Sequence, residues 1–148
     1  MTAIASEGVA RGARAGFGRR LVAALIDGIL ISIVGGILAA VMGSTSGRAI
    51  GALIGLVYIV FFEGSPSGQT IGKRAMGIRV YDFRSGSADG IGYGRAIIRY
   101  FGRIVSALPI FLGYFWMLWD SEKQTWHDKF AGSVVVPTDA YPVSGWPR

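Results

Sequence analysis

Hydrophobic residues are concentrated in three long stretches, and the first two of these predict membrane-spanning helices. After its initial arginines, the stretch 17–42 contains one carboxylate and is otherwise apolar, glycine or serine. At about 1.5 Å per residue, it is long enough to cross about 30 Å of hydrocarbon. A glycine- and serine-rich turn at 43–48 leads into a second apolar stretch, 47–62, which ends at Glu63. This short connection predicts an antiparallel helical hairpin.

The third hydrophobic region, 96–119, has a different pattern. Its first half places apolar residues on one helical face and Arg99 and Arg103 towards the other, which is typical of a helix lying at a membrane surface. Pro109 then interrupts the helix, and a half-length apolar segment follows. We interpret the region as a Pro-broken amphipathic or re-entrant element. A single span is the alternative, and it would place the segment around Asp128 on the opposite side of the membrane.

Polar segments complete the domain organisation. Residues 1–16 predict a disordered basic N-terminal tail, and residues 138–148 predict a flexible C-terminal tail. Between them, 17–137 is expected to form one membrane domain that includes a polar cytoplasmic segment at 63–95.

Two short runs have the character of strands, at 77–82 and 133–136. If the third region re-enters, both runs lie on the same side of the membrane and can pair. The predicted fold is therefore a mainly α membrane protein. It combines the two-span hairpin and the Pro-broken third region with a small cytoplasmic two-stranded β element.

Small residues recur at every fourth position in both predicted spans. In lipid, helix association rests on van der Waals packing, and small residues at this spacing let two backbones approach closely. We therefore predict that the two stripes form the contact between the helices. The stripes are Gly28, Ser32 and Gly36, flanked by Ala24 and Ala40, in the first span, and Gly47, Gly51 and Gly55 in the second.

Composition and charge support a membrane location. The chain of 148 residues is 51% hydrophobic and 16% charged, and it has no cysteine, which excludes disulfides and cysteine-based metal sites. The net charge of +6 could suggest nucleic acid, but the basic residues flank hydrophobic segments, as in contact with anionic lipid headgroups. We therefore expect no nucleic acid. The excess of Lys and Arg before the first span and after the second predicts that the N-terminus and 63–95 are cytoplasmic.

Asp27 is the ionisable residue within the first span. Arg20 lies on nearly the same helical face but about 10 Å away along the axis, so a direct ion pair is not expected. Arg20 instead would anchor the helix at the interface, while Asp27 needs a cation from elsewhere, and Arg99 and Arg103 are the available ones. Two interpretations remain open. Asp27 is either a proton or cation site, or one member of a buried ion-pair network that fixes how the third region docks.

Other candidate chemistry is weak. The segment 67–77 fails the phosphate-loop pattern because Ser67 replaces the first glycine and Arg74 follows Lys73, so both basic residues are expected to contact headgroups. His127 is the only histidine and cannot anchor a multi-histidine metal site. Next to Asp128 it could transfer protons, although such a residue more often caps a turn or bonds a neighbour. We predict no enzymatic activity, no metal and no cofactor.

Four motifs, in order along 17–137, resemble the RDD family of small bacterial membrane proteins, which is named for an arginine and two aspartates. The sequence departs from the family pattern at Ile71, where proline is usual, and at Trp126. The motifs are "RLVAALID", with Arg20 and Asp27; "GQTIGKRAMGIRVYD", with Lys73; "AIIRY", with Arg99; and "QTWHDKFAGSVVV", with Asp128 as the second aspartate and Asp120 as a less favoured candidate.

The resemblance implies a multi-pass protein of the bacterial inner membrane and leaves its activity open, with cation/proton antiport suggested for some members. One hypothesis is an oligomer that supports ion, proton or small-solute transport, with Asp27 as the ionisable site and Arg99 or Arg103 as its counter-charge. The alternative is a non-catalytic accessory or scaffold subunit of a larger membrane complex. The expected partners are anionic lipids, bound in part through Arg74, Arg79 and Arg95, together with further copies of the chain or other membrane proteins.

Overall fold

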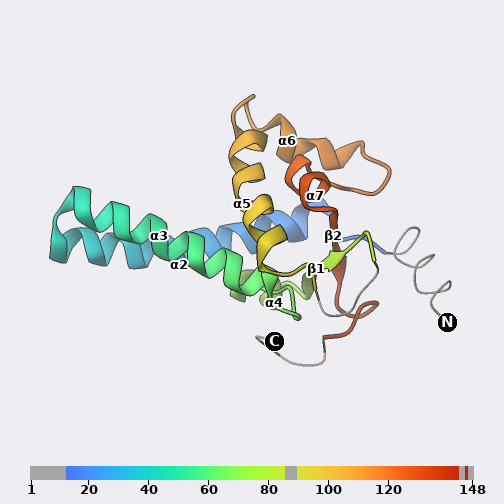
Figure 1. Cartoon of the computed structure of the whole chain (residues 1–148), viewed down its shortest axis with the longest axis horizontal. Coiled ribbons are helices and arrows are strands. Elements are labelled where there is room, and N and C mark those ends of the chain that lie inside the picture. Colours follow the sequence, from blue (N-terminus) through green and yellow to red (C-terminus); the bar gives the residue numbers. More distant parts are fainter. Residues whose placement is uncertain (1–12, 86–89, 144–145, 147–148) are drawn as a thin grey trace.

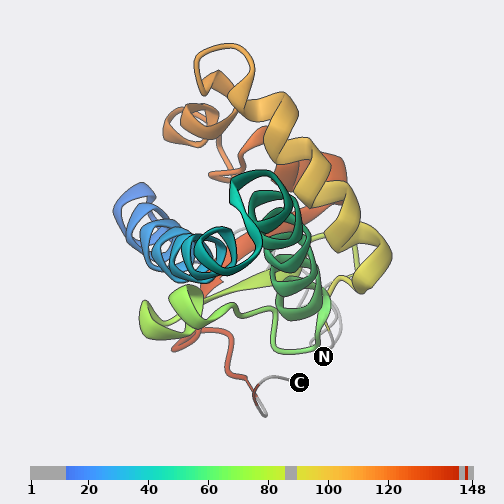
Figure 2. The same cartoon turned by 90° about the vertical axis from the view of Figure 1, so that its left-hand side faces the viewer.

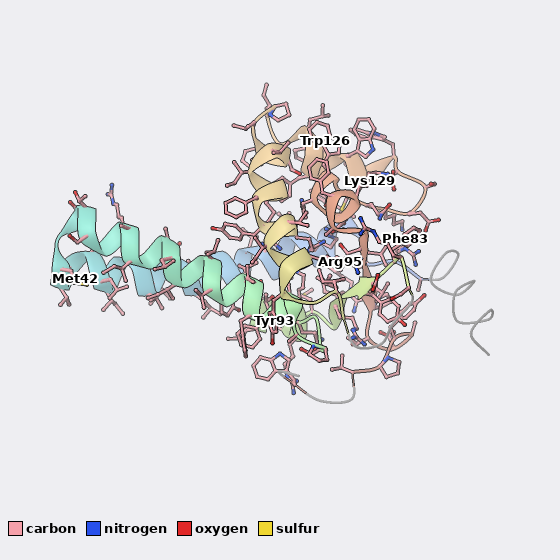
Figure 3. The ribbon with its side chains drawn as sticks, viewed as in Figure 1. Met42, Phe83, Tyr93, Arg95, Trp126 and Lys129 are labelled. Carbon is pink, nitrogen blue, oxygen red and sulfur yellow. The ribbon has the colours of Figure 1, made fainter. Side chains whose placement is uncertain are left out.

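The structure, a computed structural model, describes residues 13–85, 90–143 and 146, and it is mainly helical with one small sheet. Two long helices project together from a body that contains the other elements (Figure 1). Met42 lies at the far end of this helix pair, whereas Arg95, Trp126 and Lys129 lie in the body (Figure 3). The elements are α2 (Phe17–Met42), α3 (Ser44–Gly64), α4 (Ile71–Ala75), β1 (Ile78–Asp82), α5 (Tyr93–Ala107), α6 (Leu112–Phe115), the 3-10 helix η1 (Trp116–Leu118), α7 (Trp126–Ala131) and β2 (Ser133–Pro137).

Both α2 and α3 are long and apolar enough to cross a membrane. Large apolar side chains point outward along the pair, among them Ile29, Ile37, Leu53 and Val57, each more than half exposed. An apolar surface this extensive is unusual for a protein surrounded by water and is expected where lipid covers the helices.

A single residue separates the two helices. The sequence predicts a turn over 43–48, but α3 already begins at Ser44, and Gly43 alone reverses the chain. Its φ of +92° is a conformation that glycine adopts without a side-chain clash.

The glycines of α3 lie at its contact with α2, as predicted. Gly47, Gly51 and Gly55 are buried, and an added Cβ at Gly51 would lie 2.9 Å from the Cα of Gly35. The opposing positions of α2 are Ile31, Gly35 and Ala39.

The predicted stripe on α2 is wrong. Gly28, Ser32 and Gly36 are exposed, and a Cβ added at either glycine would meet nothing within 4 Å. The rotation of α2 is fixed instead by the burial of Ala23 and Asp27 against α4. The same helical face continues every fourth residue through Ile31, Gly35 and Ala39, and these are the residues that contact α3.

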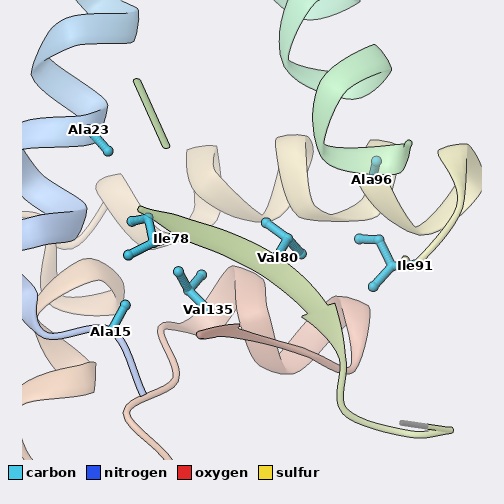
Figure 4. Packing of buried hydrophobic residues seen from close by; sticks show 7 residues of the cluster. All are labelled: Ala15, Ala23, Ile78, Val80, Ile91, Ala96 and Val135. Carbon is cyan, nitrogen blue, oxygen red and sulfur yellow. The ribbon is translucent and has the colours of Figure 1, made fainter. Parts of the chain in front are cut away.

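The two strands pair in antiparallel register, with Ile78 opposite Pro137 and Asp82 opposite Ser133. This confirms the predicted small sheet. One face of it contributes Ile78, Val80 and Val135 to the hydrophobic core. Figure 4 shows these side chains converging with Ala15, Ala23, Ile91 and Ala96.

Helix α5 runs across the helix pair rather than along it (Figures 1 and 2). One face exposes apolar residues such as Ile97, Phe101 and Ile104, while Arg99 and Ser106 are buried on the other. The chain then bends by 109° between α5 and the α6–η1 segment, at the break that contains Pro109. The amphipathic character and the break follow the sequence prediction.

The described parts of both termini contact the body. Ala15 donates its backbone N–H to the carbonyl of Val135 at 2.9 Å, and the Trp146 indole donates to the carbonyl of Gln69 at 3.0 Å. Tyr141 packs against Tyr81. These contacts tie residues 13–16 and the described residues after 137 to the sheet and α4. The rest of the predicted tails, residues 1–12, 144–145 and 147–148, lies outside the described residues.

Replacing Gly51 by leucine is expected to destabilise the helix pair by about 1–3 kcal/mol, because the new side chain would overlap the backbone of α2. The matched control is Gly36→Leu on the exposed face of α2, with an expected effect within about 0.5 kcal/mol. Heating the detergent-solubilised variants and measuring the surviving monodisperse fraction by gel filtration would compare them. Equal loss for both variants would show that Gly51 is not at a tight contact.

Candidate functional site

Glu63, at the end of α3, is the centre of a buried group of charges. Lys73 of α4 lies 2.9 Å from its Oε1, and Arg99 of α5 donates from Nε to Oε2 at 3.2 Å. Arg103, one turn further along α5, also pairs with Oε1. Glu63 is fully buried, so one carboxylate that is removed from water pairs with three cations from two other helices.

Asp128 is the second carboxylate of the group and links it to α7. Arg99 pairs with its Oδ1, and the Nη1 of Arg20 donates to Oδ2 at 2.7 Å. Burial acts to raise the pKa of Asp128, but Arg20 and Arg99 outweigh it and hold that pKa well below its usual range. Asp128 therefore stays ionised in the folded protein.

We name these six residues the buried ion network. Within it, two carboxylates are shared by four basic side chains, an excess of two positive charges when Lys73 is protonated. Its members come from α2, α3, α4, α5 and α7: Arg20, Glu63, Lys73, Arg99, Arg103 and Asp128.

Local sequence explains how the short helices present their charges. In α7, Thr125 and Asp128 form a capping box, in which each side chain accepts a hydrogen bond from the other residue's backbone N–H. In α4, Thr70 caps the helix by accepting from the backbone N–H of Lys73 at 3.2 Å. The two caps fix where Asp128 and Lys73 enter the network.

Asp27 does not belong to the buried ion network. Its Oδ1 accepts from the Tyr58 hydroxyl at 2.7 Å and from the backbone N–H of Gly72 at 2.9 Å, and its Oδ2 accepts from the Thr70 hydroxyl at 2.6 Å. The expectation that Arg99 or Arg103 would pair with it is wrong, because both arginines are directed to Glu63. Through these hydrogen bonds Asp27 instead connects α2 to α3 and to the start of α4.

The departure at Ile71 has a structural counterpart beside Asp27. The backbone N–H of Ile71 donates to the Tyr58 hydroxyl at 3.0 Å, and this hydroxyl in turn donates a hydrogen bond to Asp27. A proline at position 71 has no N–H and could not make this bond.

His127 lies beside the network with both ring nitrogens near hydroxyl groups. Thr125 is 2.9 Å from Nε2 and Ser106 is 3.3 Å from Nδ1. Burial lowers the pKa of His127 well below its usual value, and the nearby arginines act in the same direction against the opposing effect of Asp128. The imidazole is therefore neutral at physiological pH, and it bonds neighbours, as the commoner of the two sequence interpretations expects.

Several basic residues that the sequence predicts to bind lipid headgroups contact other parts of the protein instead. Lys73 is buried, which lowers its pKa although Glu63 acts in the opposite direction. Arg79 donates to the carbonyls of Pro66 and Pro142, and Arg95 pairs with Asp82 at 2.9 Å. The Arg74 guanidinium is exposed and lies over the Trp146 ring.

Asp120, the less favoured candidate for the second aspartate, lies in a loop and pairs with Lys129 at 2.7 Å. It also accepts from the backbone N–H groups of Glu122 and Gln124. Its contacts are local, whereas Asp128 joins Arg20 and Arg99 from distant parts of the chain.

Sequence reasoning missed Glu63, which it treated only as the end of the second span. A usable signal was present. In an antiparallel pair, the end of α3 lies beside the start of α2, so Glu63 must lie level with Arg20, and the cations of the third region must also dock there.

A cavity of about 600 Å³ lies beside the buried ion network, between α2, α3, α5 and the α6–η1 segment. Four basic residues line it, Arg20, Lys73, Arg99 and Arg103, together with Asp27. The rest of the lining is mainly apolar and includes Leu21, Ile31, Ile59, Phe111, Phe115 and Met117, with Tyr100, Tyr114, Thr125 and His127 among them. We call the four basic residues the cationic floor of the cavity and its apolar residues the apolar walls.

Replacing Glu63 by glutamine is expected to destabilise the fold by about 3–5 kcal/mol, because Lys73, Arg99 and Arg103 lose the buried carboxylate that they share. The control Glu122→Gln removes a carboxylate outside the network that is 31% exposed and pairs with Arg14, and it should destabilise the fold by clearly less than Glu63→Gln. Thermal unfolding in detergent, followed by tryptophan fluorescence, measures both. A Glu63→Gln variant that melts with the control would contradict the proposed centre of the network.

Stability is expected to fall as the pH decreases from about 7 to 5. The histidine of the unfolded chain takes up a proton near pH 6.5, whereas His127 in the folded protein stays neutral. The comparable loss from Asp128 begins only below about pH 4. Because His127 is the only histidine, His127→Gln should remove this slope. Melting temperatures at pH 7.5, 6 and 5 provide the test, and an unchanged slope in the variant would refute it.

The chain matches the RDD family over residues 14–132, as the resemblance of its motifs predicts. It is 30% identical over 89 residues to a proline-rich antigen homolog of Mycobacterium tuberculosis, covering 60% of this chain and 36% of that protein. It is 32% identical over 88 residues to the proline-rich antigen of Mycobacterium leprae, covering 57% and 34%. The chain thus spans about a third of the length of these curated relatives. No solved structure matches it. Because the family match extends over most of the sequence and includes two helices able to span a membrane, the chain belongs to the RDD family as a membrane-type protein.

Proposed function

We propose that the protein is a non-catalytic accessory subunit of a larger membrane assembly, in which the buried ion network holds a polar body rigidly against two spanning helices. The observation that supports this most directly is that the carboxylates inside the protein are already bonded to several partners each. Glu63 is bonded to three cations, Asp128 to two arginines and Asp27 to three hydrogen-bond donors. A carboxylate that shuttles a proton or cation must release its partners, and here each release would disconnect two or more helices.

The same proposal orients the protein in the bacterial inner membrane. We place α2 and α3 across the bilayer as a hairpin with the body on the cytoplasmic side. Nearly all the basic residues of the described chain lie at the body end, and Arg48 lies near the opposite end, which agrees with the positive-inside rule.

We place α5 and the α6–η1 segment in the cytoplasmic interface as a re-entrant element. The crosswise direction of α5 and its apolar face suit a helix lying in the plane of the membrane. At the bend, Leu108 is 76% exposed and Ile110 90% exposed, which supports the insertion of this corner into lipid.

Transport of an ion or small solute by an oligomer is the second candidate. It is favoured by the cavity, which reaches Asp27 from between the spanning helices and α5. In this case Asp27 would have to exchange its three donors for the transported species.

Proteoliposomes that contain the purified protein and a pH-sensitive dye distinguish the two candidates. The accessory function predicts no cation-dependent proton flux above that of empty vesicles, and no effect of Asp27→Asn. A flux that Asp27→Asn abolishes and Glu122→Gln preserves would overturn the accessory proposal in favour of transport.

The accessory function also predicts a defined assembly. Purification from the native membrane in mild detergent, with cross-linking and mass spectrometry, should recover the chain in a stoichiometric complex with a membrane protein. Recovery of a lone monomer under conditions that preserve other complexes of that membrane would count against it.

A further inference from the structure

Beyond the proposed function, we propose that the cavity beside the buried ion network is a binding site for an acidic membrane lipid, with its anionic headgroup on the cationic floor and part of one acyl chain along the apolar walls.

The floor carries an unused hydrogen-bond donor. Arg99 is fully buried and borders the cavity, and its Nη2 has no hydrogen-bond partner among the described residues. Its Nε and Nη1 are both engaged, with Glu63, Asp128 and Ser133. A buried guanidinium N–H without an acceptor is costly, and a charged oxygen is the acceptor that suits it best.

The charge balance at the cavity favours an anion. Arg20, Lys73, Arg99 and Arg103 exceed Asp27, Glu63 and Asp128 by one positive charge when Lys73 is protonated. Of the four cations, Arg103 is the most accessible, with a fifth of its side chain exposed, and its one hydrogen bond within the described chain is made through Nη2. A monoanionic phosphodiester would complete the balance and could accept from Arg99 and Arg103 together.

The apolar residues that line the cavity favour a lipid over a free anion. Ile31 and Ile59 come from the helices assigned to the membrane, and Phe111 and Phe115 come from the corner that we place in the interface. A free phosphate would contact the floor and leave these walls uncovered. A volume of about 600 Å³ is in the range of small-molecule sites and can hold a headgroup with several methylene groups. The cavity also borders Ala52, an exposed residue on α3, so an acyl chain can pass from it into the surrounding bilayer.

The test measures binding of three probes to the full chain in a neutral detergent by native mass spectrometry. The probes are dioctanoyl-phosphatidylglycerol, dioctanoyl-phosphatidylcholine and glycerol 1-phosphate. We expect saturable binding of phosphatidylglycerol that is at least about tenfold tighter than binding of either other probe. Equal affinity for phosphatidylcholine would overturn the anion site, and equal affinity for glycerol phosphate would overturn the lipid assignment.

Variants then locate the binding. Arg103→Gln removes a cation of the floor, and Ala52→Trp fills the apolar side without touching any charge; each should weaken phosphatidylglycerol binding about tenfold or more. The control Arg48→Gln also removes one positive charge, but at the far end of the helix pair, and it should bind phosphatidylglycerol as the wild type does. If Ala52→Trp binds normally in a protein of unchanged thermal stability, the cavity is not the site, whatever the outcome for Arg103→Gln. None of these results depends on whether the protein has a partner subunit or transports ions.

Discussion

The fold depends on the neutralisation of Glu63. A carboxylate that is fully removed from water is tolerated only when its charge is matched within a few ångströms, and here the matching cations come from α4 and α5. Arg99 extends the same linkage to Asp128, and Asp128 extends it to Arg20 at the start of α2. One continuous set of ion pairs therefore connects both long helices to every helix of the body that packs against them, apart from the α6–η1 segment.

This linkage gives the small protein a rigid junction between two different environments. The α2–α3 pair is held by van der Waals packing of glycines, which suits lipid, whereas the body has a conventional apolar core around the sheet. Apolar packing crosses the boundary between them at a few places, such as Ala23 of α2 in the core and Phe17 stacked on Phe115. The ion pairs and the hydrogen bonds of Asp27 add to these contacts, and because they are strong in a medium of low dielectric they demand a single geometry.

The sequence was sufficient for the long elements and insufficient for the pairing of charges. Hydrophobic length predicts α2 and α3, and Pro109 predicts the break in the third region, because these features follow from local chemistry. Arg20, Arg99 and Asp128 could be singled out through the family resemblance, and the structure brings them together. The partners of Asp27 could not be obtained in this way, since they depend on the rotation of α2, whereas Glu63 could have been found from the antiparallel pairing of the two long helices. The short helices α4 and α7 were missed for a related reason, because their caps act on segments too short to show a hydrophobic period.

Gly43 has a consequence for how the protein meets its surroundings. A connection of one residue leaves almost no chain at the far end of the helix pair, and Arg48 is the sole charged side chain of the described chain near it. In the proposed placement across the bilayer, neither helix can enter without the other, and the pair inserts as a unit. In the proposed orientation, the described chain presents little more than a hairpin tip to the opposite compartment, so its surfaces for recognition by other molecules lie inside the membrane or at the body.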